Sequence, residues 1–526
     1  MRRAEEAGVK YVDIAKTPLN PDFLRILDLE KAQEAEVLPF YSMGKKVELA
    51  VADLNAPKTI ETVEALKKAG YEINLYLSSG IGLSEAYKIY GSTQQYKKPE
   101  LIERVEQSSI KTYEKEIASM KEIEARIGGV TAEEALNMVN VGAIKAGASD
   151  AHFEPEKNGV FVRFRIDGML HKVMVIKPEV YANILSQIKY KSRMRLNVSN
   201  VPQDGRYEFR FNDRDIDVRV SSIPTPYGES FVCRFLDQKP NSMNFEELGF
   251  EGHSLRKLTN AAKISHGMIL TTGPTGSGKT TTLYTLINSM KKPENKIITL
   301  EDPVEYYIEG VTQSQIEEKH GYSFASGLRS VLRHDPNIVM IGEIRDLDTA
   351  QTAAQAALTG HVVLSTLHTN SAIESIPRLI NMGLPPFMVA PALDTIIAQR
   401  LVRKVCPNCV TMRDISASEK VQFETLINNL KAVNPTLEAN VPNKIPEIKG
   451  CDKCSQTGYS GRMVVCEAVT VTEEMKRLIL AGSSTINLIA AARKEGMITM
   501  REDGFLKVAK GLTTLDEVYR ATNVID

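Results

Sequence analysis

The stretch Gly273-Pro274-Thr275-Gly276-Ser277-Gly278-Lys279-Thr280 decides the fold, because it reads G-x-x-x-x-G-K-T between two different periodicities. Residues 268–271 before it form an apolar run typical of a buried strand, and residues from Thr281 to Met290 have helical spacing. A glycine-rich turn in this setting curls backbone N–H groups around a phosphate, and the helix N-terminus adds partial positive charge. We therefore expect all eight residues and Thr281 to bind a nucleotide, with Lys279 on the β- and γ-phosphates and Thr280 on Mg²⁺.

The alternation of short apolar strands and helices continues after this loop. Residues 297–300, 338–341 and 362–365 are further apolar runs, each followed by polar or glycine residues and then by a helical segment. Such strands predict a parallel sheet covered on both faces, so we expect an α/β domain over residues 241–526. Ligands of these sheets bind outside the carboxyl ends of the strands. The residues that directly follow each run are therefore the candidate site residues.

Carboxylates follow two of these runs. Glu301 ends one strand and Glu343 follows another, and carboxylates beside a phosphate loop can hold Mg²⁺ through water and orient the attacking water. Both compete for the role of general base; we place Glu343 nearer Mg²⁺ and Glu301 nearer the water. His368 closes a fourth strand at the same edge, so it is a candidate sensor of the γ-phosphate. The alternative for His368 is a satisfied core or surface histidine.

The upstream sequence divides into three parts with different patterns. Residues 1–95 combine two short strands with a helix, which predicts a small α/β domain. Residues 96–129 carry apolar residues at three- and four-residue steps, which predicts an amphipathic connector helix. Residues 130–240 contain strictly alternating stretches and turn signals, which predict an α+β domain with arginines on its exposed strand faces. The strands expected in this domain are residues 160–166, 207–211, 216–221 and 230–236, with a helix over 180–194.

Four of the six cysteines form two C-x-x-C pairs. Cys406 and Cys409 make one pair, and Cys451 and Cys454 make the other. Two such pairs can complete a Cys₄ site around a structural Zn²⁺, so we expect a zinc-binding insert over residues 400–465. A redox-active dithiol is the alternative.

Composition narrows the class of protein. The chain has 526 residues, which favours three or four domains, and 65 Lys+Arg against 66 Asp+Glu give a net charge of −1. A protein that coats nucleic acid would usually carry a basic excess, so we expect no direct nucleic-acid partner. No window of about 18 apolar residues is present, which predicts a cytosolic chain without a transmembrane segment.

The motifs occur in an order that resembles a known family. Residues 273–280, 300–305, 332–346 and 359–370 are similar, in this order, to the Walker A motif, Asp box, Walker B motif and His box of the secretion ATPase superfamily. This superfamily contains the motors of type II secretion and type IV pilus assembly. Further stretches that resemble its second N-terminal domain or its C-terminal tail are residues 149–155, 162–168, 202–206 and 458–504. Residues 12–90 resemble part of its first N-terminal domain.

This resemblance implies a function. It implies a RecA-like ATPase domain, a homo-hexameric ring, and ATP hydrolysis coupled to mechanical work on an inner-membrane platform protein. The implied location is cytoplasmic, peripheral at the inner face of the plasma membrane. Type IV pilus assembly is the first expectation, with type II secretion or a competence pilus as the alternative. A nucleic-acid translocase and a nucleotide-gated scaffold are alternatives from other classes.

The resemblance also adds residues to the candidate site. Arginines spread the negative charge of a transferring phosphoryl group, and those that match the family's pattern are expected to reach the phosphates. The alternative for each arginine is a surface or interface ion pair. The residues carried over in this way are Arg219, Arg234, Arg329, Arg333, Arg345, Asp302 and His361.

Overall fold

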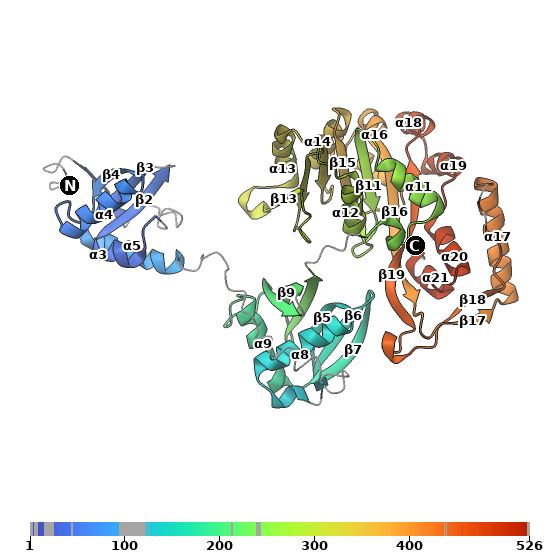
Figure 1. Cartoon of the computed structure of the whole chain (residues 1–526), viewed down its shortest axis with the longest axis horizontal. Helices are drawn as coiled ribbons and strands as arrows, with labels where there is room; N and C mark the ends of the chain where they lie inside the picture. Colours follow the sequence, from blue (N-terminus) through green and yellow to red (C-terminus); the bar gives the residue numbers. More distant parts are fainter. Residues whose placement is uncertain are drawn as a thin grey trace. The chain divides into compact units, whose positions relative to one another are not determined.

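The computed structural model describes residues 4, 9–14, 26–43, 46–93, 123–124, 126–211, 214–237, 243–435, 437 and 439–522 (Figure 1). The chain forms two compact units, residues 1–103 and 104–526. The connector helix expected over residues 96–129 lies largely outside the described residues. Its described part is helical at residues 123, 124 and 126 and ends in the 3₁₀ turn η2 (Ile127–Gly129).

The N-terminal unit is a small α/β unit, as its sequence predicted. Its four-stranded sheet has the order β1 (Lys10–Tyr11), β4 (Glu72–Leu77), β3 (Lys46–Val51) and β2 (Val37–Met43). The helices are α3 (Leu29–Glu34), α4 (Pro57–Lys68) and α5 (Gly80–Thr93). Helix α4 buries Val63 and Leu66 in the same core as Leu49 of β3, which follows from their spacing of three residues on one helix face.

An antiparallel sheet forms the first core of the second unit. Its strand order is β7 (Met169–Ile176), β6 (Gly159–Ile166), β5 (Ala148–Glu156), β10 (Gly228–Asp237), β9 (Arg214–Thr225) and β8 (Gln203–Phe211). Helices α8 (Ala132–Lys145) and α9 (Pro178–Lys191) share its hydrophobic core. Cross-strand register pairs Arg206 with Arg219 and Arg219 with Arg234, so three arginines lie in one row on one sheet face. The expected arginine-bearing face is therefore confirmed.

The second core is built around a seven-stranded sheet. Its order is β13 (Thr312–Gln315), β12 (Ile297–Glu301), β14 (Ile338–Ile341), β15 (Val362–Leu367), β11 (Gly267–Thr272), β16 (Leu393–Val405) and β19 (Tyr459–Thr470). The first six strands are parallel, and β19 is antiparallel to β16. The predicted parallel sheet is thus confirmed with one added antiparallel edge strand. Strand β11 lies between β15 and β16, near the middle of the sheet (Figure 1).

Helices cover both faces of this sheet. One face packs on α11 (Gly252–Ala261) and α12 (Lys279–Met290), through apolar residues such as Leu258 and Leu283. The other face packs on α13 (Phe324–Val331), α14 (Leu347–Leu358), α16 (Pro386–Ala392) and α18 (Glu473–Leu480). The remaining described helices of this core are α10 (Phe245–Leu248), α15 (Ser375–Asn381), α19 (Thr485–Lys494), α20 (Met500–Ala509) and α21 (Leu515–Thr522), with 3₁₀ turns η3 (Glu318–His320) and η4 (Leu332–His334).

Strands β16 and β19 flank the cysteine-bearing insert. Between them lie β17 (Thr411–Asp414), α17 (Ala417–Val433), β18 (Lys444–Glu447) and the turn η5 (Asp452–Cys454), with β17 and β18 paired antiparallel. Helix α17 packs on the C-terminal helices, where the ring of Phe423 lies 5.0 Å from that of Phe505. The insert therefore has a small core of its own against α20 and α21.

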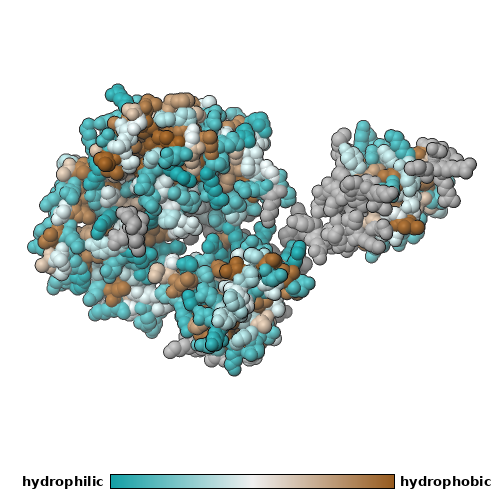
Figure 2. All heavy atoms as spheres, turned by 180° about the vertical axis from the view of Figure 1, so that it is seen from behind, coloured by the Kyte–Doolittle hydropathy of each residue, from teal (hydrophilic) through white to brown (hydrophobic). Residues whose placement is uncertain are grey.

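The surface is mixed in polarity. On the face shown in Figure 2, hydrophilic residues predominate and hydrophobic residues lie between them. The most exposed large apolar side chains among the described residues include Ile81, Tyr307 and Ile486. Within the described ranges, no helix combines the length and the apolar character needed to cross a membrane.

Candidate nucleotide site and metal centre

The phosphate loop joins β11 to α12 at the carboxyl edge of the sheet. Gly278 directly precedes α12 with a left-handed φ of 85°. Gly273 has a φ of 146°, and a Cβ there would lie 2.6 Å from the carbonyl oxygen of Gln399. Only glycine fits both positions without strain. The hydroxyl of Ser277 is buried and has no hydrogen-bond partner among the described residues. An unpaired buried donor beside free helix N–H groups suits a phosphate oxygen.

Lys279 is folded back onto the loop in this structure. Its Nζ donates to the carbonyl oxygens of Gly273 at 2.8 Å and Pro274 at 3.1 Å. Burial lowers the pKa of Lys279 to about 8, the carboxylate of Glu343 opposes this shift, and the Arg400 guanidinium adds to it. A phosphate would restore the stability of the charged form, because an anion next to an ammonium group favours protonation.

Glu343 lies at the centre of a cluster at the end of β14. Its Oε1 pairs with Arg345 Nη2 at 2.5 Å, and its Oε2 lies 3.2 Å from His368 Nε2. The hydrogen bond from Arg345 to Glu343 is the main reason that the pKa of Arg345 is raised. The structure thus brings together three of the predicted residues from two different strand ends. Asp302, which is exposed, also acts electrostatically on Arg345.

Glu301 lies in a different environment. Its side chain is buried at the end of β12, and burial raises its pKa although three hydrogen bonds oppose this shift. The hydroxyls of Tyr284 and Thr299 donate to its carboxylate, the latter at 2.6 Å, and Gln313 Nε2 donates at 3.1 Å. Both carboxylate oxygens therefore have partners within the protein. Glu343 is only partly buried and is the carboxylate that acts on Lys279.

Arg219 reaches the same edge from the antiparallel sheet. Its Nη1 pairs with Glu305 Oε2 at 3.2 Å and its Nη2 donates to the carbonyl oxygen of Val304 at 3.0 Å. Both partners belong to the loop that follows Glu301 and Asp302. Strand β9 therefore places one predicted arginine against a loop of the nucleotide site.

The other predicted arginines have partners elsewhere in this chain. Arg234 Nε pairs with Asp150 at 2.8 Å, and Arg329 pairs with Asp348 at 2.9 Å. Arg333 donates to the carbonyl oxygen of Arg329 at 3.0 Å. These three guanidinium groups are not brought to the phosphate loop of the same chain.

His361 lies at the opposite end of β15 from His368. Its Nδ1 is 3.0 Å from the carbonyl oxygen of Ala356, at the end of α14. Strand β15 separates the two histidines by six residues, about 20 Å of extended chain. The structure therefore places His368, and not His361, at the edge that carries the phosphate loop.

Two contacts to the phosphate loop come from residues that the sequence analysis did not select. Gln399 Nε2 donates to the carbonyl oxygen of Ser277 at 2.8 Å, and its Oε1 accepts from Thr282 at 2.9 Å. The neighbouring Arg400 lies close to Gly273, where its Nη1 would be 3.2 Å from an added Cβ. Both lie on β16, where two adjacent polar residues interrupt an apolar run. That interruption was the available signal.

The four paired cysteines form one cluster. The Sγ atoms of Cys406 and Cys451 are 3.9 Å apart, those of Cys409 and Cys454 are 3.8 Å apart, and Cys451 and Cys454 are separated by 3.7 Å. Four sulfurs at about 2.3 Å from a zinc ion stand about 3.8 Å apart in a tetrahedron. These distances are far longer than a disulfide bond of about 2 Å. The donor set and its spacing therefore fit zinc.

Backbone groups support thiolate in this cluster. The N–H groups of Cys451 and Gly458 both donate to Cys454 Sγ at 3.2 Å. Burial would raise the pKa of Cys454, but these donors outweigh it and lower the pKa to about 6. A thiolate is the form that binds metal. The two other cysteines, Cys233 and Cys466, are buried and lie outside the cluster.

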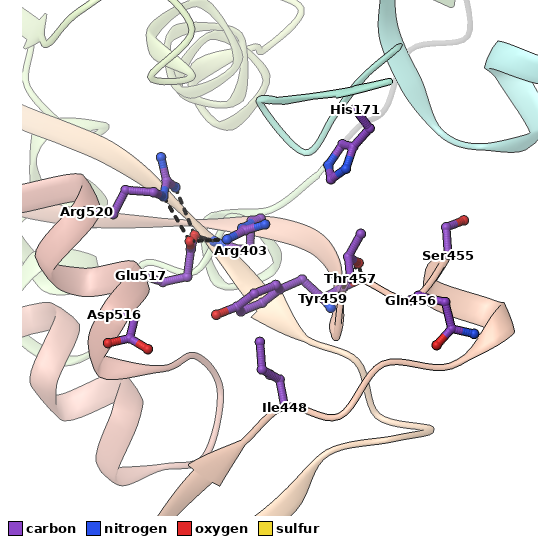
Figure 3. Close-up of a pocket in the computed structure, with 10 residues that line it drawn as sticks. All are labelled: His171, Arg403, Ile448, Ser455, Gln456, Thr457, Tyr459, Asp516, Glu517 and Arg520. Atoms are coloured by element: carbon purple, nitrogen blue, oxygen red, sulfur yellow. Dashed lines mark hydrogen bonds and ion pairs between the residues drawn. The ribbon is translucent and has the colours of Figure 1, made fainter. Parts of the chain in front are cut away.

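A pocket of about 610 Å³ lies beside the insert (Figure 3). On one side, Arg403 of β16 and Arg520 of α21 both bind Glu517, at 2.5 and 2.8 Å. The guanidinium of Arg403 also lies 4.0 Å from the centre of the Tyr459 ring. Glu517 bridges the two arginines and offsets one of their two positive charges. This pocket is thus held together by its own ion pairs.

Comparison with known proteins agrees with this geometry. The family model described as type II/IV secretion system protein matches residues 129–520. The type IV pilus assembly ATPase PilB of Myxococcus xanthus is 36% identical over 527 residues, which cover 99% of this chain and 90% of that protein. The type II secretion system protein E of Pseudomonas aeruginosa is 41% identical over 387 residues, 74% of each chain.

A solved structure supports the fold. The X-ray structure of the ATPase DotB from Legionella pneumophila superposes with a TM-score of 0.54 at 20% identity, and covers 74% of this chain and 95% of that one. With the phosphate loop at the carboxyl edge of a RecA-like sheet, these matches identify a P-loop ATPase. The chain belongs to the type II/IV secretion system protein family.

Proposed function

We propose that this chain assembles type IV pili, as a homo-hexameric motor at the cytoplasmic face of the inner membrane. The proposal rests on how much of this chain each group of relatives matches. The type IV pilus assembly ATPases of Myxococcus xanthus and Pseudomonas aeruginosa match 99% of the chain, including its N-terminal unit. The type II secretion proteins of Pseudomonas aeruginosa and Dickeya dadantii match 74%. Type II secretion or a competence pilus is therefore the second candidate.

The site residues take the following roles in this proposal. Residues 273–281 hold the phosphates of ATP, with Lys279 on the β- and γ-phosphates. Thr280 and Glu343 hold Mg²⁺, which neutralises charge on the phosphates when bound. Glu301 orients the attacking water, and Arg219 moves from Glu305 to the phosphates. The contacts of Glu343 with Arg345 and His368 support a role beside the γ-phosphate.

The remaining predicted residues are assigned to assembly or support. In a ring, Arg234, Arg329 and Arg333 would serve a neighbouring copy, since each is away from the phosphate loop of its own chain. Asp302 keeps its predicted role near the nucleotide in the proposal, whereas His361 lies at the opposite end of β15 and is given no role at the nucleotide. The zinc cluster holds the insert, and the inner-membrane platform protein receives the motion. The proposal also keeps the predicted division of the chain into four parts, with boundaries after residues 95, 129 and 240.

Genetics and biochemistry test this function together. Deleting the gene in the source organism should remove surface pili and leave secreted proteins unchanged, and the Lys279→Ala chain should not restore them. The purified chain should retain the platform protein encoded with the pilus genes in a pull-down. Loss of secreted proteins with intact pili would transfer the proposal to type II secretion. ATPase activity stimulated by DNA would favour a nucleic-acid translocase.

A further inference from the structure

The loop that carries His368 is fastened at both ends beside the phosphate loop. Near its start, the N–H of Thr369 donates to Thr272 Oγ1 at 2.9 Å, and Thr272 is the last residue of β11. Near its end, the N–H of Ala372 donates to Glu467 Oε1 of β19 at 2.6 Å. Between these anchors the loop depends on further contacts for its position.

Arg400 supplies such a contact from β16. Its Nη2 donates to Asn370 Oδ1 at 3.1 Å and lies 3.4 Å from the carbonyl oxygen of the same residue. Its Nη1 donates to the carbonyl oxygen of Gln399 at 3.2 Å and would lie 3.2 Å from a Cβ at Gly273. One guanidinium group therefore lies beside the first glycine of the phosphate loop and is hydrogen-bonded to the loop of His368.

The charge of Arg400 is unusual for a buried side chain. Arg400 is 8% exposed, and no carboxylate among the described residues lies within salt-bridge distance of it. Its hydrogen bonds go to neutral oxygens, and burial lowers its pKa although Glu467 and Glu374 act against this at longer range. Buried charges are normally paired. The site therefore has a second cation near Lys279, and this cation acts electrostatically on the lysine.

We propose that Arg400 is a positioning residue for ATP hydrolysis, which couples the occupied phosphate loop to His368 through Asn370. The inference rests on the roles proposed above for the phosphate loop and His368. When phosphates occupy the loop, Arg400 holds Asn370 through its hydrogen bonds, and this keeps His368 within reach of Glu343, now at 3.2 Å. Arg400 itself does not bind the phosphates in this arrangement.

Double-mutant cycles on the full-length chain test the coupling. Arg400→Gln should lower kcat by about 10- to 100-fold, because small misplacements of catalytic groups have effects of this size. Binding of a fluorescent ATP analogue with Mg²⁺ should change by less than about threefold. Adding Asn370→Ala, or His368→Gln, to Arg400→Gln should cost little more, because coupled residues are not additive. Arg400→Lys should remain impaired, since lysine keeps the charge but lacks the fork.

Arg403→Gln is the matched control. Arg403 lies three residues further along the same strand and binds Glu517 instead (Figure 3), so kcat should stay within about twofold. An equal loss of nucleotide affinity and kcat/KM in Arg400→Gln would show a direct phosphate ligand and overturn the proposal. Additive effects with Asn370→Ala would overturn it too. If Arg400→Gln does not fold, Arg400→Lys takes its place in the cycle with Asn370→Ala, and non-additive effects on kcat are again expected. Failure of the role proposed for the phosphate loop can be told apart from failure of the Arg400 proposal. In that case the Lys279→Ala chain would hydrolyse ATP at the wild-type rate.

Discussion

At the scale of single residues, Lys279 links the protonation of the site to nucleotide binding. Burial lowers the pKa of Lys279 to about 8. Near pH 8, part of the nucleotide-free protein therefore carries Lys279 as the neutral amine. Phosphates favour the ammonium form and raise the pKa again. Binding of a Mg²⁺–ATP analogue should therefore take up protons near pH 8, and affinity should fall as pH rises above that value. Calorimetry in two buffers of different ionisation enthalpy measures the uptake.

Lys279→Arg is the control for this effect, because arginine stays protonated at these pH values. The proton uptake should disappear in this variant even where binding persists. Lys279→Ala should abolish turnover. Uptake that is unchanged in Lys279→Arg would assign the titrating group to another residue.

Glu467 provides a second pH-dependent prediction. Burial raises its pKa to about 7 from an ordinary value near 4.5, so the folded state retains a proton that the unfolded state releases between these values. Stability from this group is complete below pH 4.5 and is lost as pH rises through 7. Glu467→Gln keeps an acceptor for Ala372 and should gain up to roughly 3 kcal/mol over wild type between pH 5 and pH 8. Thermal melting in a pH series checks this; parallel curves would contradict it.

At the scale of elements, the four-cysteine cluster closes the insert between β16 and β19 and fits a zinc ion. Without metal, four sulfurs that lie within 4.8 Å of one another would repel one another as thiolates. Chelation should release about one zinc ion per chain and lower the melting temperature by roughly 5–10 °C. Metal analysis and melting curves measure both effects.

Cys454→Ser should reproduce the effect of chelation, because it removes one of the four donors. Cys233→Ala is the control, since Cys233 is buried in the antiparallel sheet domain outside the cluster. Zinc content that is unchanged in Cys454→Ser would rule out the four-cysteine centre.

The strands that the sequence predicted are those with uniform surroundings. Strands β11, β12, β14 and β15 are buried on both faces, so each reads as a short apolar run. Strand β16 was not predicted, because Gln399 and Arg400 interrupt its apolar pattern for contacts with the phosphate loop. Its partner β19 begins with exposed residues beside the insert and becomes apolar only from Met463 onward. The polar contacts of β16 with the phosphate loop, and the exposed start of β19 beside the insert, therefore masked the apolar patterns of these two strands.

The sequence predicted the site residues that directly follow apolar strands, but not the contacts between side chains on different elements. Glu343 and His368 follow apolar strands and meet at one sheet edge, as strand ends of a parallel sheet must. The partner of Glu301 could not be predicted, because Tyr284 lies on α12 at ordinary core spacing and its hydroxyl meets the carboxylate only in the folded chain. Contacts between side chains on different elements leave no local pattern.

At the scale of the whole molecule, ring assembly has a measurable signature. Arg234 and Arg329 are at least half exposed in this chain and away from its own phosphate loop. If they act on the nucleotide of a neighbour, turnover per chain should rise with protein concentration as hexamers form. Steady-state ATPase assays with light scattering over the same concentrations test this. Arg234→Gln should lower turnover of the assembled protein by about 10-fold or more, and activity per chain that is independent of concentration would contradict the ring.

The position of β16 has a mechanical consequence. This strand touches the nucleotide loop at Gln399 and ends at Val405, directly before the first metal-binding thiol, Cys406. Its antiparallel pairing with β19 makes a two-stranded ribbon of about 23 Å from the loop to the cysteine cluster. A small tilt of these strands near Gln399 would therefore produce a larger displacement at the cysteine cluster. Cobalt bound by the four cysteines would give a visible absorption band, which reports whether all four sulfur donors stay in place when nucleotide binds.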